Sequence, residues 1–453
     1  MREEPQRGPL FYLAARSWAT AFGDGVADMR EFTAIFGAVG IVLAYLLGRR
    51  LTQSVLGGAV SAALVAVSPI LLHLSRQVRE YVCLADATLA AALLLLACLE
   101  RPTAWRWAIY AAGSIAEFFI SPIFISVWAA HAVTVLSSRQ PRRTIVGWAI
   151  AIGCSAAVCL PWLFDSLRAA PAHARDLAWL SNPYAPKALA LKWVFNVGAV
   201  FFDSEIVHHV FVLVLIPVFL IVAFAAITAA KRFRDVRFAL VISTVVCGFA
   251  PSIAIDTVKH THFEAVTRYQ MVAWIGIEML VVLAIANALV SLDAGKSAVA
   301  AVAFLYLTAA GLFAYAFDRP YEVWWDNNGH LDDRAIAAAI ASRGPRAFVL
   351  SSNAPILLTL ARYLPDDTRI VLFRYEVRPP DAPAHAFLFE PAPVVIDAFR
   401  RRLGSSGAVV NVTPAGSLAI PELDSERDGR TNDADTAARP LWQIGAGAQL
   451  PVP

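Results

Sequence analysis

Arginine and tyrosine occur together at two places in the sequence, each directly before a long apolar run. Arg79 and Tyr81 end the stretch "HLSRQVREY", and Arg268 and Tyr269 lie near the end of the stretch "KHTHFEAVTRYQ". A guanidinium fork can hold a phosphate group through paired, charge-assisted hydrogen bonds. The two pairs are therefore candidates for binding a phosphate at a membrane surface. The alternative is that these residues are interfacial anchors at the headgroup level.

The second stretch also carries Lys259, His260 and His262. Two histidines separated by one residue would lie on one face of a strand and could bind a metal ion. A single His-x-His pair is weak evidence for such a site, and several cations in one loop suit an anionic headgroup better. We therefore predict that these three residues contribute to anion binding, and we predict neither a metal site nor a cofactor.

The composition indicates which elements must position these residues. Hydrophobic residues make up 58% of the chain and charged residues 16%, and the mean hydropathy is +0.58. A soluble fold could not bury so much apolar surface, and spanning a bilayer takes about 20 apolar residues. We expect an all-α polytopic membrane protein of about ten segments, near residues 32–48, 54–72, 82–99, 105–119, 120–136, 144–164, 207–229, 238–256, 270–290 and 297–316. The segment 105–119 is the shortest and carries Glu117.

The distribution of positive charge predicts how the bundle is oriented. The five loops 49–53, 100–104, 137–143, 231–237 and 291–296 hold eleven Lys and Arg residues in 30 positions. The loops 73–81, 165–206 and 257–269 hold eight in 64 positions. Because cytoplasmic loops retain positive charge, we place the second set outside, together with residues 1–31 and everything after residue 317. This outer face is periplasmic or lumenal, and the location that we expect is a bacterial inner membrane.

The remaining composition excludes several classes of protein. The five cysteines fall inside or at the edges of apolar runs, so we expect small packing residues and not a disulfide framework or a zinc site. These cysteines are Cys83, Cys98, Cys154, Cys159 and Cys247. The net charge of +3 is explained by the topology and gives no support for nucleic-acid binding.

We divide the chain into four parts. Residues 1–31 are predicted to be an outer loop with an interfacial helix, and residues 32–317 form the transmembrane bundle. Residues 318–403 alternate helix and strand patterns and are predicted to be a small extracytoplasmic α/β domain. Residues 404–453 are rich in Gly, Ser, Asp, Asn and Pro and are predicted to be disordered. Within the bundle, the loop 165–206 is predicted to carry an amphipathic helix, either packed on the membrane surface or serving as a lid.

Three stretches resemble motifs of one membrane-enzyme family. "RGPLFYLAARSWATAFGDG" resembles the H-P-P-L-Y-Y motif and the interfacial helix that follows it in the GT-C membrane glycosyltransferases. This family includes protein O-mannosyltransferases, lipid A aminoarabinose transferases and Rgt-type bacterial enzymes. "SRQVREY" is similar to the family's S-Q-E-A-R-M-Y pattern, and "TRYQMVAWIGIEML" to its R-Y-L-L-P-A-L-P span. The resemblance runs from about Arg7 to Asp367, and the order and spacing of the motifs carry it.

The resemblance implies a chemistry. Family members move a sugar from a polyprenyl phosphate to a hydroxyl of a glycan, lipid or protein acceptor on the outer face of the membrane. A carboxylate accepts the proton of that hydroxyl, and cations stabilise the departing phosphate. Arg79 and Arg268 match motif positions suited to the phosphate, with Tyr81 and Tyr269 in support.

The chain also departs from the family pattern. Arg7 and Gly8 replace the His-Pro pair, Gln77 stands where Glu is usual, and Gln270 stands where Leu is usual. The family's first span and the acidic pair that provides the catalytic carboxylate precede the first motif, so we expect sequence to be missing upstream of Met1. Glu3 and Glu4 are the acidic candidates within the chain, but they lie too close to Arg7 to match that pair well.

Two other functions stay open at this point. The missing acidic pair is compatible with a truncated, non-catalytic accessory protein of the same family. A transporter or flippase would also be polytopic with charged cavity residues, but transporters typically show internal repeats, and we find none here.

Overall fold

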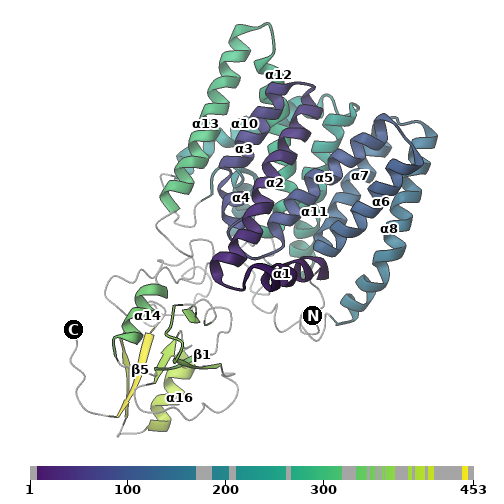
Figure 1. Cartoon of the computed structure of the whole chain (residues 1–453). Helices are drawn as coiled ribbons and strands as arrows, with labels where there is room; N and C mark the ends of the chain where they lie inside the picture. Colours follow the sequence, from purple (N-terminus) through teal and green to yellow (C-terminus); the bar gives the residue numbers. More distant parts are fainter. Residues whose placement is uncertain are drawn as a thin grey trace. The chain divides into compact units, whose positions relative to one another are not determined.

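The computed structural model describes most of the bundle and the secondary structure of the part that follows it (Figure 1). The chain divides into two compact units, Met1–Phe317 and Asp318–Pro453. The described residues are 8–169, 186–203, 211–261, 267–318, 333–343, 347–351, 357, 360–361, 363–372, 386–389, 393–403, 407–412 and 441–446.

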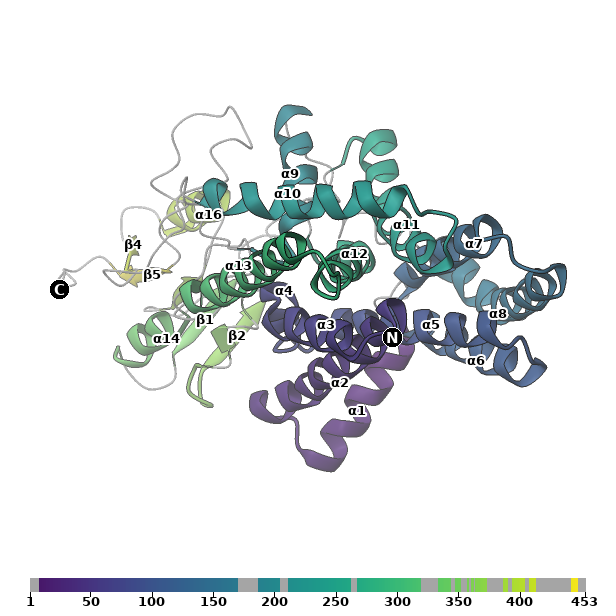
Figure 2. The same cartoon turned by 90° about the horizontal axis from the view of Figure 1, so that it is seen from above.

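The first unit is a helical bundle (Figures 1 and 2). Its α-helices are α1 (Pro9–Phe22), α2 (Val26–Thr52), α3 (Val55–Val67), α4 (Pro69–Leu74), α5 (Tyr81–Glu100), α6 (Ala104–Ile120), α7 (Ile125–Ser137), α8 (Arg142–Ala169), α9 (Pro186–Gly198), α10 (Phe211–Ala230), α11 (Val236–Lys259), α12 (Met271–Leu289) and α13 (Ala294–Asp318). Two short 3₁₀ helices, η1 (Pro122–Phe124) and η5 (Thr267–Gln270), precede α7 and α12.

The predicted polytopic helical architecture is confirmed, with differences in length. Among the described residues, seven helices are long and apolar enough to cross a membrane, namely α2, α5, α8, α10, α11, α12 and α13. The other three predicted segments coincide with α3, α6 and α7, of 13, 17 and 13 residues. The segment expected at 54–72 divides at Ser68, which is extended because Pro69 disfavours the helical conformation of the residue before it.

Helix α12 is the centre of the bundle. It packs against α2, α3, α5, α10 and α11, and its apolar side chains are buried all around the helix, as expected for a helix that is hydrophobic on every side. Two glycines let α11 and α12 approach closely. A Cβ on Gly248 would lie 2.4 Å from the backbone nitrogen of Ala273, and one on Gly276 would lie 2.8 Å from that of Val245. Small residues at such crossings are typical of membrane helices.

The helix directions define two ends of the bundle. The site end carries residues 75–81 and 267–270, and α1 lies across it in Figure 1. The opposite end carries the connections 52–54, 101–103, 138–141, 231–235 and 290–293.

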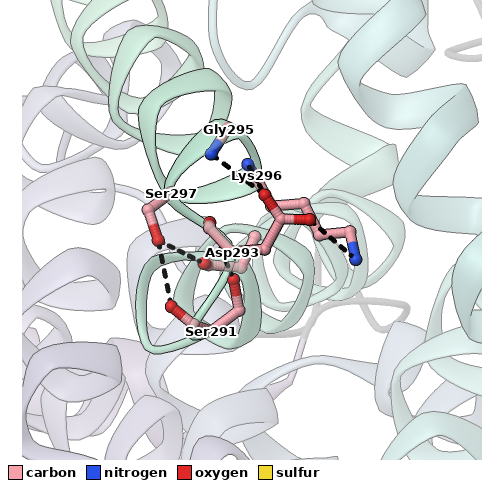
Figure 3. A network of polar contacts seen from close by, with 6 residues as sticks. Ser291, Asp293, Gly295, Lys296 and Ser297 are labelled. Carbon is pink, nitrogen blue, oxygen red and sulfur yellow. Dashed lines mark hydrogen bonds and ion pairs between the residues drawn. The ribbon is translucent and has the colours of Figure 1, made fainter.

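Charged residues at the opposite end cap and join helices. Asp293 accepts hydrogen bonds from the backbone nitrogens of Gly295 and Lys296 at 3.0 and 3.1 Å, and the Lys296 ammonium lies 3.2 Å from its second oxygen (Figure 3). Ser297 donates to the carbonyl oxygens of Ala288 and Ser291, at 3.1 and 3.3 Å. These contacts fix the tight turn between α12 and α13, as side-chain caps commonly do at helix starts.

The second unit is an α/β domain. Its elements are α14 (Asp333–Ala341), β1 (Phe348–Ser351), β2 (Arg369–Leu372), β3 (Phe387–Phe389), α16 (Pro393–Leu403), β4 (Gly407–Asn411) and β5 (Leu441–Ala446). The strand order is β2-β1-β3-β5-β4; β1 is parallel to β2 and β3, and β5 is antiparallel to β3 and β4. Ile336 and Ile340 of α14 pack on one face of the sheet, and Ile396 and Phe399 of α16 pack on the other.

The C-terminal part differs from the sequence expectation. We predicted that residues 404–453 are disordered, but β4 and β5 lie within this range and complete the sheet. Both are short apolar segments, "GAVVN" and "LWQIGA", separated by a long polar stretch. The tail is polar on average, so its composition does not indicate the two strands. One of them, β5, buries Leu441, Trp442 and Ile444.

Candidate functional site

The first two sequence motifs meet at the site end. Tyr12 on α1 donates a hydrogen bond of 3.4 Å from its hydroxyl to Glu80 Oε2, directly before α5. Phe11 packs with Val82 and Cys83 in one hydrophobic cluster. Gly8 allows α1 to begin against the end of α6, because a Cβ there would lie 2.3 Å from the carbonyl oxygen of Ile120. Helix α1 is therefore fixed against the start of α5.

The third motif joins the second through aromatic rings. Tyr81 and Tyr269 contact edge to face, with ring centroids 6.2 Å apart. The guanidinium carbon of Arg268 lies 6.0 Å from the Tyr81 centroid and 5.8 Å from the Tyr269 centroid, which is the range of a cation–π contact. Tyr81 is only 5% exposed. Arg268 is thus held beside two aromatic rings at the site end.

Arg79 precedes Tyr81 by two residues. It is half-buried, and its charge acts on the Tyr81 side chain, though less than that of Arg268. The structure therefore brings three of the predicted site residues, Tyr81, Arg268 and Tyr269, into contact, and Arg79 lies next to them in the chain. They come from two segments almost 190 positions apart in the chain.

The other predicted residues are placed less centrally. Lys259 and His260 are exposed at the end of α11, where His260 ends the helix in the left-handed conformation with φ 52°. His262, Glu3 and Glu4 lie outside the described residues. In the part of the chain that the structure describes, no cluster of three or more His, Cys, Asp or Glu residues could hold a metal ion.

The structure adds Glu80, which the sequence did not single out. It is 8% exposed, stands between Arg79 and Tyr81, and occupies the N-cap position of α5. Its side chain makes no hydrogen bond to the described backbone of α5 and instead accepts from Tyr12. The sequence contained one signal for Glu80. It is a carboxyl group directly before an apolar span, in a motif where Gln77 replaces the usual Glu.

His73, near the end of α4, contacts Gln77 of the second motif and is a neutral group. Burial, followed by the charges of Arg76 and Arg30, lowers the pKa of His73 to about 3. Its Nε2 lies 2.6 Å from Nε2 of Gln77. His73 therefore adds no positive charge at neutral pH.

Comparison with known proteins agrees with this architecture. Residues 6–164 match the family described as dolichyl-phosphate-mannose-protein mannosyltransferase. The crystal structure of apo ArnT from Cupriavidus metallidurans superposes with a TM-score of 0.53 at 14% identity, covering 98% of this chain and 89% of ArnT. The crystal structure of the same protein bound to undecaprenyl phosphate gives a TM-score of 0.50 at 15% identity, covering 98% and 90%. No curated protein sequence matches the chain significantly.

The matched residues 6–164 include Tyr12, Arg79, Glu80 and Tyr81. The structural match extends over nearly the whole chain and so includes the segment of Arg268. The resemblance inferred from the three motifs is thereby confirmed: this integral membrane protein has the fold of the GT-C membrane glycosyltransferases.

Proposed function

We propose that the protein is a membrane glycosyltransferase that takes a sugar from a polyprenyl phosphate carrier and passes it to an acceptor hydroxyl on the outer face of a bacterial inner membrane. The observation that carries the proposal is the contact of Tyr81, Arg268 and Tyr269 at one end of a GT-C bundle, with Arg79 two residues before Tyr81. Two cations at the surface end of apolar helices suit a ligand with a phosphate head and an apolar tail.

The arginines would act on the carrier phosphate. When the sugar leaves, negative charge develops on the phosphate oxygens, and donors already aimed at that position stabilise it without reorganising. Arg268 is restrained between two tyrosine rings before any ligand arrives. Its guanidinium therefore loses little side-chain freedom on binding, which favours affinity.

Glu80 is our candidate for the carboxylate that handles the acceptor. An alcohol is a poor nucleophile until a base accepts its proton, and this assistance typically contributes about 10²- to 10⁴-fold in rate. Glu80 stands between Arg79 and Tyr81 in the second motif, and its side chain accepts a hydrogen bond from Tyr12. Tyr12 fixes one of its oxygens and so orients the other.

The test uses the full chain reconstituted in lipid vesicles. Undecaprenyl phosphate should bind, whereas undecaprenol, which has the same tail without the phosphate, should bind at least tenfold more weakly. Labelled hexose and pentose donors on polyprenyl phosphate are then offered with vesicle lipids as acceptors, and release of polyprenyl phosphate is followed. Equal binding of the two polyprenols would contradict the proposal. Selective binding with no release from any donor would favour the non-catalytic accessory role.

A further inference from the structure

A cavity of about 210 Å³ lies inside the bundle between α2, α4 and α5, with α3 and α12 completing its wall. Its lining is apolar except for the side chains of Ser75 and Asp86. Ala34 and Ala38, on the α2 side, are both lining residues and exposed. Because α2 is one of the helices long enough to span the membrane, this side of the cavity faces the bilayer.

Asp86 is an unusual residue in such a place. It sits within the first turns of α5, is 7% exposed, and its Oδ2 is fully enclosed without a hydrogen-bond partner among the described residues. No described cation forms an ion pair with it. A carboxyl group inside a membrane segment is costly, and residues of this kind usually serve a ligand or transport path. Its cost would be offset by a ligand that donates a hydrogen bond.

Two glycines of α2 leave room for the two polar side chains, Gly40 for Asp86 and Gly37 for Ser75. A Cβ on Gly40 would lie 2.6 Å from Asp86 Oδ1, and a Cβ on Gly37 would lie 2.7 Å from Cβ of Ser75. Side chains at these positions would displace Asp86 and Ser75 and fill the space between the helices. The Ser75 hydroxyl donates to the carbonyl oxygen of Leu72 at 2.8 Å, so its remaining lone pairs can accept.

We propose that this cavity binds an amphiphile from the bilayer whose polar end donates a hydrogen bond, as an amine or a hydroxyl does. Asp86 is the acceptor, Ser75 is a second acceptor, and the apolar wall takes the adjoining hydrocarbon. The cavity lining offers no positively charged side chain, so nothing in it favours an anionic headgroup. This site does not depend on the proposed sugar transfer.

The experiment compares three probes of one chain length, dodecylamine, dodecanol and dodecyl methyl ether, for binding to the full chain in nanodiscs by native mass spectrometry. The ether matches the alcohol but has no donor. We expect the amine and the alcohol to bind at least tenfold more tightly than the ether. Asp86→Leu should remove this preference, whereas Asp86→Asn should keep dodecanol and lose the advantage of the amine.

Two further variants keep the test decisive. Glu117→Gln changes a carboxyl group on α6 that is equally buried but does not line the cavity, and it should leave all three affinities unchanged. Ala38→Leu narrows the bilayer side of the cavity and leaves Asp86 unsubstituted. It should weaken the binding of all three probes, and this result does not depend on how well the Asp86 variants fold. Equal binding of ether and alcohol to the unmodified protein, or undiminished binding by Ala38→Leu, would overturn the proposal.

Discussion

The two ends of the helical bundle use their charged residues in different ways. At the opposite end, Arg50 makes paired hydrogen bonds to Glu100, and Asp235 and Asp293 cap helices α11 and α13 while pairing with nearby cations. At the site end, Glu80 also stands at an N-cap position, but its side chain accepts from Tyr12 and not from the helix backbone. Carboxylates therefore cap helices at the opposite end, whereas the carboxylate of Glu80 at the site end does not cap α5.

The partners of the cations explain what this difference means for function. At the opposite end, Arg50 pairs with Glu100 and Arg237 pairs with Asp235. Arg268 instead lies beside the faces of Tyr81 and Tyr269. We therefore assign the anionic ligand to Arg268 at the site end and a structural role to Arg50 and Arg237.

The sidedness of the two ends gives an all-or-none prediction. Cysteines introduced at His260, at the site end, and at Gln140, at the opposite end, should differ in labelling by a membrane-impermeant maleimide. We expect His260→Cys to be labelled in intact cells and Gln140→Cys only after permeabilisation, because the opposite end carries the excess of positive charge. Labelling in the reverse order would invert the topology and move the site end to the cytoplasm.

Replacing Glu80 should have the largest effect on rate. Glu80→Gln keeps an oxygen for Tyr12 but cannot accept a proton, so sugar transfer should fall about 10²- to 10⁴-fold. Binding of undecaprenyl phosphate should not weaken. The matched change Glu100→Gln at the opposite end should leave transfer intact. If Glu80→Gln transfers at the normal rate, the carboxylate that activates the acceptor lies elsewhere.

Replacing Arg79 should have a more moderate effect, and this effect should be on binding of undecaprenyl phosphate. Arg79→Ala should weaken binding of undecaprenyl phosphate by about 1.5 to 3 kcal/mol, the range for hydrogen bonds to charged groups, which corresponds to about 10- to 150-fold. Arg79→Lys keeps the charge but loses the guanidinium fork, so it should recover only part of the affinity. Titration of vesicle-bound ligand measures both. Full recovery by lysine would show that only charge matters at this position.

Replacing Asp235, a carboxylate that caps a helix, should change stability and not ligand binding. Asp235→Ala should lower the free energy of unfolding by about 1 kcal/mol through loss of the N-cap of α11. A hydrogen bond from Arg237 holds the pKa of Asp235 below its usual range. The contribution of its charge is thus complete above the unfolded pKa and is lost as the pH falls through the folded one. At acidic pH, Asp235→Asn should have the same melting temperature as the unmodified protein. At pH 7 its melting temperature should be slightly lower, and binding of undecaprenyl phosphate should not change.

The sequence predicted the helices better than it predicted what lies between them. Apolar runs of about 20 residues indicated each long span, because lipid demands them. The break at Ser68 required attention to Pro69, and β5 required recognition of a six-residue apolar segment in a polar tail. Local composition over a long window cannot show either feature.

The site was predictable only in part, for a related reason. Motif order indicated that Arg79 and Arg268 could act together, but the ring contacts that hold Arg268 depend on tertiary structure. Glu80 and Tyr12 are 68 positions apart, so neither residue indicates the other. Asp86 becomes notable only once Gly40 of another helix is seen to leave space beside it.

The central claim is that Arg268, at the site end, binds the phosphate and that Arg50, paired with Glu100 at the opposite end, does not. The most direct measurement is the dissociation constant of undecaprenyl phosphate for Arg268→Gln and Arg50→Gln, each compared with the unmodified protein in the same vesicles. We predict at least a tenfold weakening for Arg268→Gln, no change for Arg50→Gln, and no effect of either change on undecaprenol. Equal effects of the two substitutions, or none from Arg268→Gln, would contradict the account.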